Sequence, residues 1–90
     1  MKKRVHAIYS GIVQGVGFRF TARHLASKHR VNGWVKNAPD GKVELEIEGD
    51  SDNVDKVLKG LREELGRYIT DVSYKELPFS GEYEDFQIAF

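Results

Sequence analysis

A chain of 90 residues is near the lower size at which a domain folds unaided, so we expect one domain spanning residues 1–90. Its 14 basic and 14 acidic residues give zero net charge, so no overall field attracts nucleic acid or an anionic membrane. The lack of cysteine excludes disulfides, thiolate chemistry and the common structural zinc sites. No run approaches the roughly 18 apolar residues of a membrane span, so we expect a soluble, cytoplasmic protein with a small-molecule ligand.

The first two elements differ in the period of their apolar residues. Residues 4–13 are rich in β-branched and aromatic types and predict a strand. Ile8 and Ile12 leave open which of its faces is buried, because they oppose a second apolar set: Val5, Ala7, Tyr9 and Val13. From Phe18 the spacing becomes i, i+4, i+7 and i+8, which predicts an amphipathic helix. Its apolar positions are Phe18, Ala22, Leu25 and Ala26.

A hairpin is predicted next. Residues 31–37 ("VNGWVKN") and 42–48 ("KVELEIE") have strand composition, and the turn signal "APDG" separates them. The second strand alternates strictly, with Val43, Leu45 and Ile47 on one face. We expect its other face to be solvated, since it carries Glu44, Glu46 and Glu48.

A second helix should follow, begun by Asp50 or Ser51 and ended by Gly66, although Gly60 is an unfavourable residue inside it. Its apolar stripe consists of Val54, Val57, Leu58, Leu61 and Leu65. Residues 68–76 again alternate as a strand, with Thr70, Val72 and Tyr74 on one side, and residues 77–85 form a loop. The last five residues form a short strand with one apolar side: Phe86, Ile88 and Phe90.

The order of these elements predicts the fold class. Strand, helix, strand, strand, helix and strand, followed by a short extra C-terminal strand, is the ferredoxin-like βαββαβ pattern of an α+β sandwich. We therefore expect an antiparallel sheet with two helices on one face.

The densest chemistry lies in "VQGVGFRF", residues 13–20, where the first strand gives way to the first helix. A helix N-terminus has unpaired N–H groups and a partial positive charge, so Arg19 in the first turn is electrostatically misplaced unless an anion lies there. Gly15 and Gly17 permit backbone conformations that turn several amides toward one point. A phosphoryl group gripped by Arg19 fits this pattern. The alternative is a tight turn with a solvent-facing Arg19, because glycine-rich connections are common.

The familiar phosphate motifs do not match this loop. "GVGFRF" begins like G-x-G-x-x-G but has Phe20 at the third glycine position, and the G-K-[ST] of a P-loop is absent.

Three segments resemble the acylphosphatase family: "GIVQGVGFR" (11–19), "GWVKNAPDGKVE" (33–44) and the closing "EDFQI" (84–88). The resemblance covers nearly the whole chain and implies a monomeric enzyme that hydrolyses the carboxylic–phosphoric anhydride of small acyl phosphates without metal or cofactor. It also implies that inorganic phosphate or sulfate binds as product or inhibitor. Arg19 is then the catalytic anion-binding residue and Asn37 positions the attacking water. The implied phosphate-binding loop comprises Gln14, Gly15, Val16, Gly17, Phe18 and Arg19.

The residue types suit this chemistry. Phosphoryl transfer to water requires groups that hold the phosphoryl, neutralise its oxygens and place the water. The Asn37 amide both donates and accepts hydrogen bonds and carries no charge to repel a dianion. Its alternative role is that of a turn-entry asparagine that bonds its own backbone before "APDG".

Two other functions remain as alternatives. A non-catalytic phosphate- or anion-binding module would use the same loop and would not need Asn37. An RNA-binding domain shares the element order, but "KVELEIE" offers three glutamates and no aromatic residue for stacking. The three histidines lack a metal-ligand spacing, so structural roles are expected for them, and packing roles for Trp34 and Tyr74.

Overall fold

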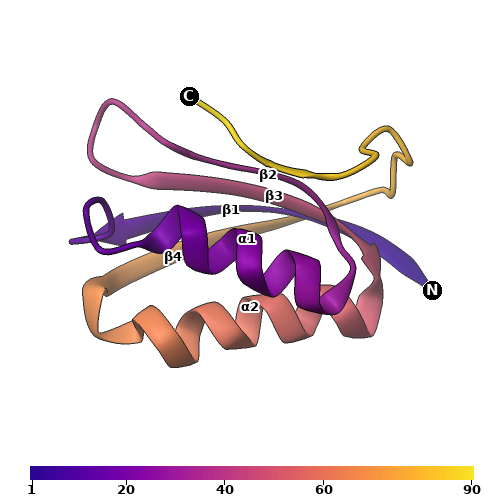
Figure 1. Ribbon diagram of the computed structural model, residues 1–90, viewed down its shortest axis with the longest axis horizontal. Helices are drawn as coiled ribbons and strands as arrows, with labels where there is room; N and C mark the ends of the chain where they lie inside the picture. The colour runs from indigo at the N-terminus through magenta and orange to yellow at the C-terminus, as the bar shows by residue number, and fades with distance from the viewer.

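The computed structural model describes all residues from Met1 to Phe90 and shows two helices packed on one face of a five-stranded sheet (Figure 1). The elements in chain order are β1 (Lys2–Gly11), α1 (Phe18–His29), β2 (Asn32–Asn37), β3 (Val43–Asp50), α2 (Ser51–Leu65), a 3-10 turn (Gly66–Tyr68), β4 (Ile69–Leu77) and β5 (Phe86–Ile88). Neither helix is both long enough and apolar enough to cross a membrane.

The sheet confirms the predicted fold. Its strand order is β4-β1-β3-β2-β5, and the four strands of the βαββαβ core pair antiparallel. The extra strand β5 instead pairs parallel with β2, so the whole sheet is mixed. The reason is positional: β4 ends beside Arg4, near the start of β1, and β5 begins beside Gly33, near the start of β2. A strand that enters the sheet at this end must run in the same direction as β2.

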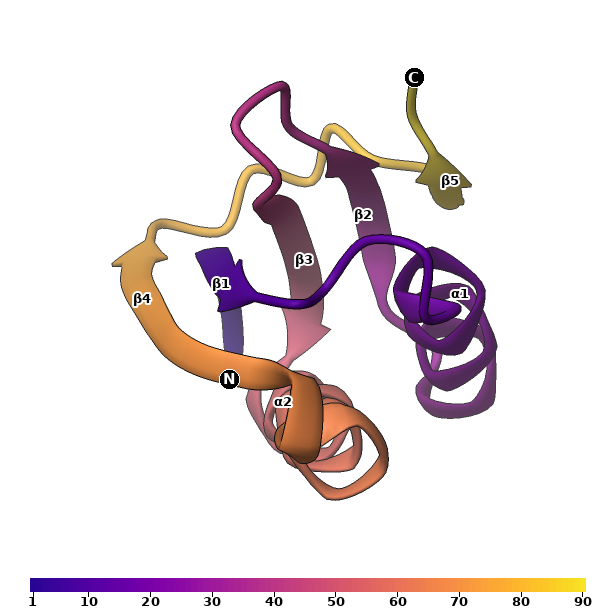
Figure 2. The same cartoon turned by 90° about the vertical axis from the view of Figure 1, so that its left-hand side faces the viewer.

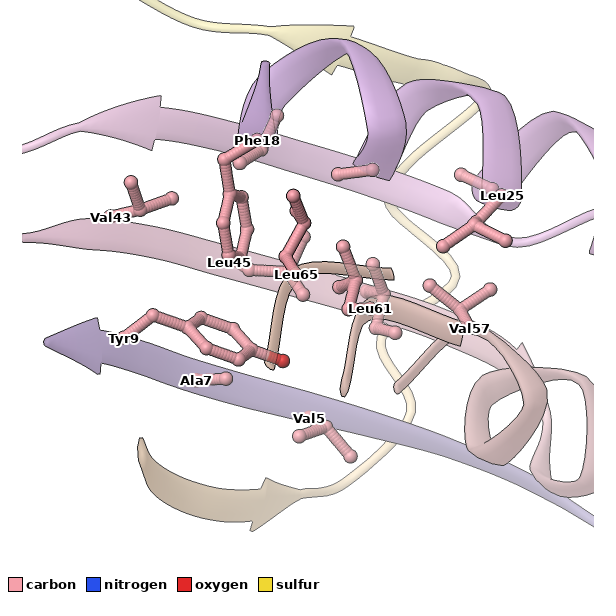
Figure 3. Close-up of a cluster of buried hydrophobic side chains, with 14 of the residues drawn as sticks. Val5, Ala7, Tyr9, Phe18, Leu25, Val43, Leu45, Val57, Leu61 and Leu65 are labelled. Carbon is pink, nitrogen blue, oxygen red and sulfur yellow. The ribbon is translucent and has the colours of Figure 1, made fainter. Parts of the chain in front are cut away.

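The helices and the sheet enclose one apolar core (Figure 3). The sequence left open which face of the first strand is buried. In the structure the buried residues are Val5, Ala7, Tyr9 and Val13. Ile12, by contrast, is 74% exposed. The four predicted core positions of α1 are all buried, and so are those of α2 except Leu58, which is partly buried against the core.

Gly60 lies where α2 packs against α1. A Cβ at this position would come within 2.9 Å of Leu25 Cδ2 and 3.1 Å of Leu25 Cδ1. Glycine lowers helix stability, but here it lets the two helices approach without displacing Leu25.

The boundaries of α2 agree with the prediction, since Asp50 is the N-cap residue and Gly66 is the C-cap residue. The Asp50 side chain makes no capping hydrogen bond.

The prediction of a solvated glutamate face on β3 is wrong. Glu46 and Glu48 are 7% and 2% exposed, because the chain after β4 crosses this face of the sheet, opposite the helices (Figure 2). Glu48 accepts hydrogen bonds from Ser80 N (3.0 Å), Ser80 Oγ (2.8 Å) and Gly81 N (3.0 Å). Strand periodicity identifies the apolar face but does not reveal that a distant segment covers the polar one.

The C-terminal strand is shorter than expected. Phe86 and Ile88 pack against the core, as predicted, but Phe90 lies beyond the strand and is fully exposed. Trp34 has the packing role expected of it: its ring edge meets His6, and its Nε1 donates to the Tyr83 hydroxyl at 3.1 Å.

Candidate active site

The loop between β1 and α1 contains two glycines in the left-handed region, Gly15 (φ 80°) and Gly17 (φ 81°). A Cβ at either position would meet no atom within 4 Å. Backbone conformation, rather than crowding, therefore makes glycine the favoured residue at both positions. The space beside the loop backbone is open to a ligand.

The backbone N–H groups of this loop have no partners in the protein. Among the backbone hydrogen bonds outside the helices and strands, none is donated by residues 13–20. Gly17 is the N-cap residue of α1 and provides no side-chain cap, and no acidic residue occupies the first helical turn. The helix N-terminus thus presents free donors and its partial positive charge at the loop.

Arg19 adds a full positive charge at the same place. It is half-buried and has no carboxylate within 4 Å, so no side chain of the protein neutralises it. Its guanidinium lies 5.8 Å from the centre of the Phe90 ring. Phe20 and Phe90 also line a cavity of about 420 Å³ next to Arg19. Sequence reasoning missed the position of Phe90, because no local pattern indicates where the residues after β5 lie.

Gln14 ties the loop to the β2–β3 turn. Its Nε2 donates to the carbonyl oxygens of Ala38 (2.8 Å) and Lys42 (2.9 Å), so the loop lies beside the residue that follows Asn37. Figures 1 and 2 show the loop and this turn at the same end of the molecule. The structure thus brings two of the predicted site segments together, through a contact that the sequence did not indicate.

Asn37 is the last residue of β2 and is half-buried. The turn after it is closed without its side chain: Ala38 N donates to Lys42 O (2.8 Å) and Lys42 N to Asp40 Oδ1 (3.1 Å). The Asn37 amide makes no hydrogen bond with the protein, so the turn-entry bonding considered for it is not found. Its donor and acceptor are available to a ligand or water.

A cluster of titratable side chains in mutual contact lies on the face of the sheet opposite the helices, away from the loop. Glu46 is at its centre. Burial alone would raise the pKa of Glu46, but hydrogen bonds from Tyr83 and His6 and the charge of Arg4 outweigh it and lower that pKa. His6 also contacts Glu44 at 3.2 Å. His6 on β1 thus contacts two glutamates of β3, which is a structural role, as predicted. The hydrogen bond from Tyr83 to Glu46 holds the segment after β4 against the sheet. No group of three or more His, Asp or Glu side chains is placed so that it could hold a metal ion.

A family model described as Acylphosphatase matches residues 5–88. An acylphosphatase of Chlorobaculum tepidum is 42% identical over 88 residues, covering 97% of this chain and 96% of that protein. An acylphosphatase of Methylococcus capsulatus is also 42% identical over 88 residues, with 96% and 95% covered. The crystal structure of acylphosphatase from Bacillus subtilis superposes with a TM-score of 0.90 at 32% identity and covers both chains completely.

Proposed function

This chain belongs to the acylphosphatase family and is an acylphosphatase, and we propose that it uses the 14–19 loop, Arg19 and Asn37 to hydrolyse small acyl phosphates without a metal. One observation carries the proposal. A run of unpaired backbone amides at a helix N-terminus lies beside an arginine with no carboxylate partner.

In this mechanism the loop holds the phosphoryl group. The amides of residues 14–19 donate to the phosphoryl oxygens, and the Arg19 guanidinium donates two parallel hydrogen bonds to them. Charge that builds on the equatorial oxygens in the transition state is thereby neutralised by groups already in position. Gln14 supports the geometry, because its two hydrogen bonds anchor the loop to the β2–β3 turn.

Asn37 orients the attacking water. The water oxygen forms a bond to phosphorus, the bond from phosphorus to the acyl oxygen breaks, and the carboxylate leaves with its electron pair. The proton of the water passes to the phosphate. Because a carboxylate is a stable leaving group, the reaction needs no strong general acid, and no cluster of acidic or histidine ligands for a metal stands near the loop. All groups in this mechanism come from one chain, so a monomer of residues 1–90 suffices.

The test is turnover of acetyl phosphate, with release of inorganic phosphate and acetate in equal amounts. We expect full activity after exhaustive treatment with EDTA, and competitive inhibition by phosphate or sulfate, since free anions present the same oxygens as the transferred group. Activity restored by Mg²⁺ or Zn²⁺ after chelation would contradict the metal-free mechanism. Phosphate binding without any turnover would favour the alternative, a non-catalytic anion-binding module.

A further inference from the structure

The cavity beside Arg19 adjoins the 14–19 loop, yet most of its lining has no part in the mechanism above. Its volume is about 420 Å³. It lies between α1 and the edge strand β5 with the residues after it, and Figure 2 shows this strand beside α1. Four of its seven lining residues are apolar: Phe20, Phe86, Ile88 and Phe90.

Two of these apolar side chains are accessible to a ligand. Phe20 is 61% exposed and Phe90 is fully exposed, whereas Phe86 and Ile88 pack against the core. The Arg23 guanidinium lies 5.3 Å from the centre of the Phe20 ring, on the same helix. Large apolar side chains that gather in water around one cavity indicate a surface that contacts a ligand.

The remaining lining residues are polar, and none of them is acidic: Arg19, Arg23 and Gln87. Arg23 follows Arg19 by one helical turn, is exposed, and like Arg19 has no carboxylate within 4 Å. The Gln87 amide donates to Asp85 at 3.3 Å, and that carboxylate is not part of the lining. An anionic substrate therefore meets no negative side chain in the cavity.

We propose that this cavity holds the acyl group of the substrate, and that Phe20 and Phe90 make the enzyme prefer acyl phosphates with a hydrocarbon chain or an aromatic ring to acetyl phosphate. The inference rests on the proposed function, because Arg19 belongs both to the phosphoryl site and to the cavity lining. The acyl group is bonded directly to the phosphoryl group that Arg19 holds, so it lies within reach of the two rings. Contact between them removes apolar surface of both partners from water.

An acyl group with a second negative charge fits the cavity less well. Arg23 is the only cation in the lining besides Arg19, and it is exposed, where an ion pair contributes little to binding. Its guanidinium already lies beside the Phe20 ring, at which an apolar acyl group would pack.

Alkyl phosphonates test this cavity without turnover, because their P–C bond is not hydrolysed. We expect methylphosphonate and butylphosphonate both to shift the amide resonances of residues 13–20 in the ¹⁵N-labelled protein, and butylphosphonate alone to shift those of residues 86–90. Butylphosphonate should bind about tenfold more tightly, since much of its longer chain leaves water. Butyryl phosphate should likewise have a lower KM than acetyl phosphate.

Phe20→Ala removes one wall of the cavity and should reduce this preference to about threefold or less. Its affinity for methylphosphonate should stay within about twofold of that of the parent, because the loop and Arg19 are intact. The variant is expected to fold, since Phe20 is an exposed helical residue and alanine favours helix. Phe79→Ala is the matched control: Phe79 is also exposed, but it follows β4 and lies near Lys2, so the preference should remain about tenfold.

Each outcome bears on a different part of the reasoning. Equal affinities for the two phosphonates in the parent would overturn the acyl site and leave the phosphoryl loop standing. Binding of neither phosphonate would overturn the loop of the proposed function, and the acyl site with it. A preference that persists in Phe20→Ala, or is lost equally in Phe79→Ala, would overturn the assignment to this cavity. Tighter binding of 3-phosphonopropionate than of butylphosphonate would overturn the preference for an apolar acyl group.

Discussion

Replacing Asn37 with alanine separates the proposed catalytic role of this side chain from a structural one. The Asn37 amide has no hydrogen-bond partner in the protein, and the turn after it is closed by other groups. Truncation should therefore change the free energy of unfolding by only about 0.5 kcal/mol, or about 2–4 °C in the thermal midpoint. Loss of one preorganised polar contact to the transition state should lower kcat and kcat/KM together by roughly 10²- to 10³-fold.

Asn32 offers a matched control on the same strand. It is also an asparagine of β2, but at the opposite end, and its Nδ2 donates to the Tyr83 carbonyl at 3.1 Å. Asn32→Ala should lose about 1 kcal/mol of stability, or about 4–8 °C, and keep normal turnover per folded molecule. The two variants should thus show opposite patterns, one losing activity and the other losing stability.

The assay combines steady-state kinetics on acetyl phosphate, the inhibition constant for inorganic phosphate and the thermal midpoint of each variant. Asn37→Ala should bind phosphate almost as the parent does, because the loop and Arg19 hold the anion. Asn37→Asp should also have low activity and bind phosphate less well, since it brings a negative charge toward a dianion. Full activity per folded molecule in Asn37→Ala would refute the reasoning and remove this residue from the mechanism.

Two further variants test the arginine and the far face of the sheet. Arg19→Lys should stay folded but lose about a hundredfold or more in kcat/KM, since an ammonium cannot make the two parallel hydrogen bonds of a guanidinium; near-normal kinetics would contradict the bidentate role. Glu46 has a folded pKa below its ordinary value of 4.5, so its contribution to stability is present above that pH and is lost as the pH falls below it. Tyr83→Phe removes a hydrogen bond that lowers this pKa. We expect Tyr83→Phe to lower the free energy of unfolding by about 1–2 kcal/mol at neutral pH and to lose less stability than the parent as the pH falls below 4.5. Urea unfolding at about pH 7 and about pH 3.5 measures both effects. The same pH dependence in parent and variant would count against this network.

The elements of the fold could be predicted because their signals are local. The i, i+4, i+7 spacing from Phe18 and the strict alternation from Val43 to Glu48 each arise from one element meeting one core, so the period alone identifies the buried face. The order of the elements then leaves few topologies, and the βαββαβ core follows. The glycines at positions 15 and 17 also carry a local signal, since left-handed backbone favours glycine.

What the sequence by itself determined is therefore each element, the buried faces of the two helices and of β3, and the position of the glycine loop at the start of α1. Only the tertiary structure decided which segments meet. Glu46 and Glu48 look like a solvated face until the chain after β4 covers them, and nothing near Gln14 indicates that it will bond the carbonyls of Ala38 and Lys42. Periodicity records whether a side chain is buried, whereas hydrogen bonds and charge compensation depend on groups that are distant in the chain and near only in the folded protein.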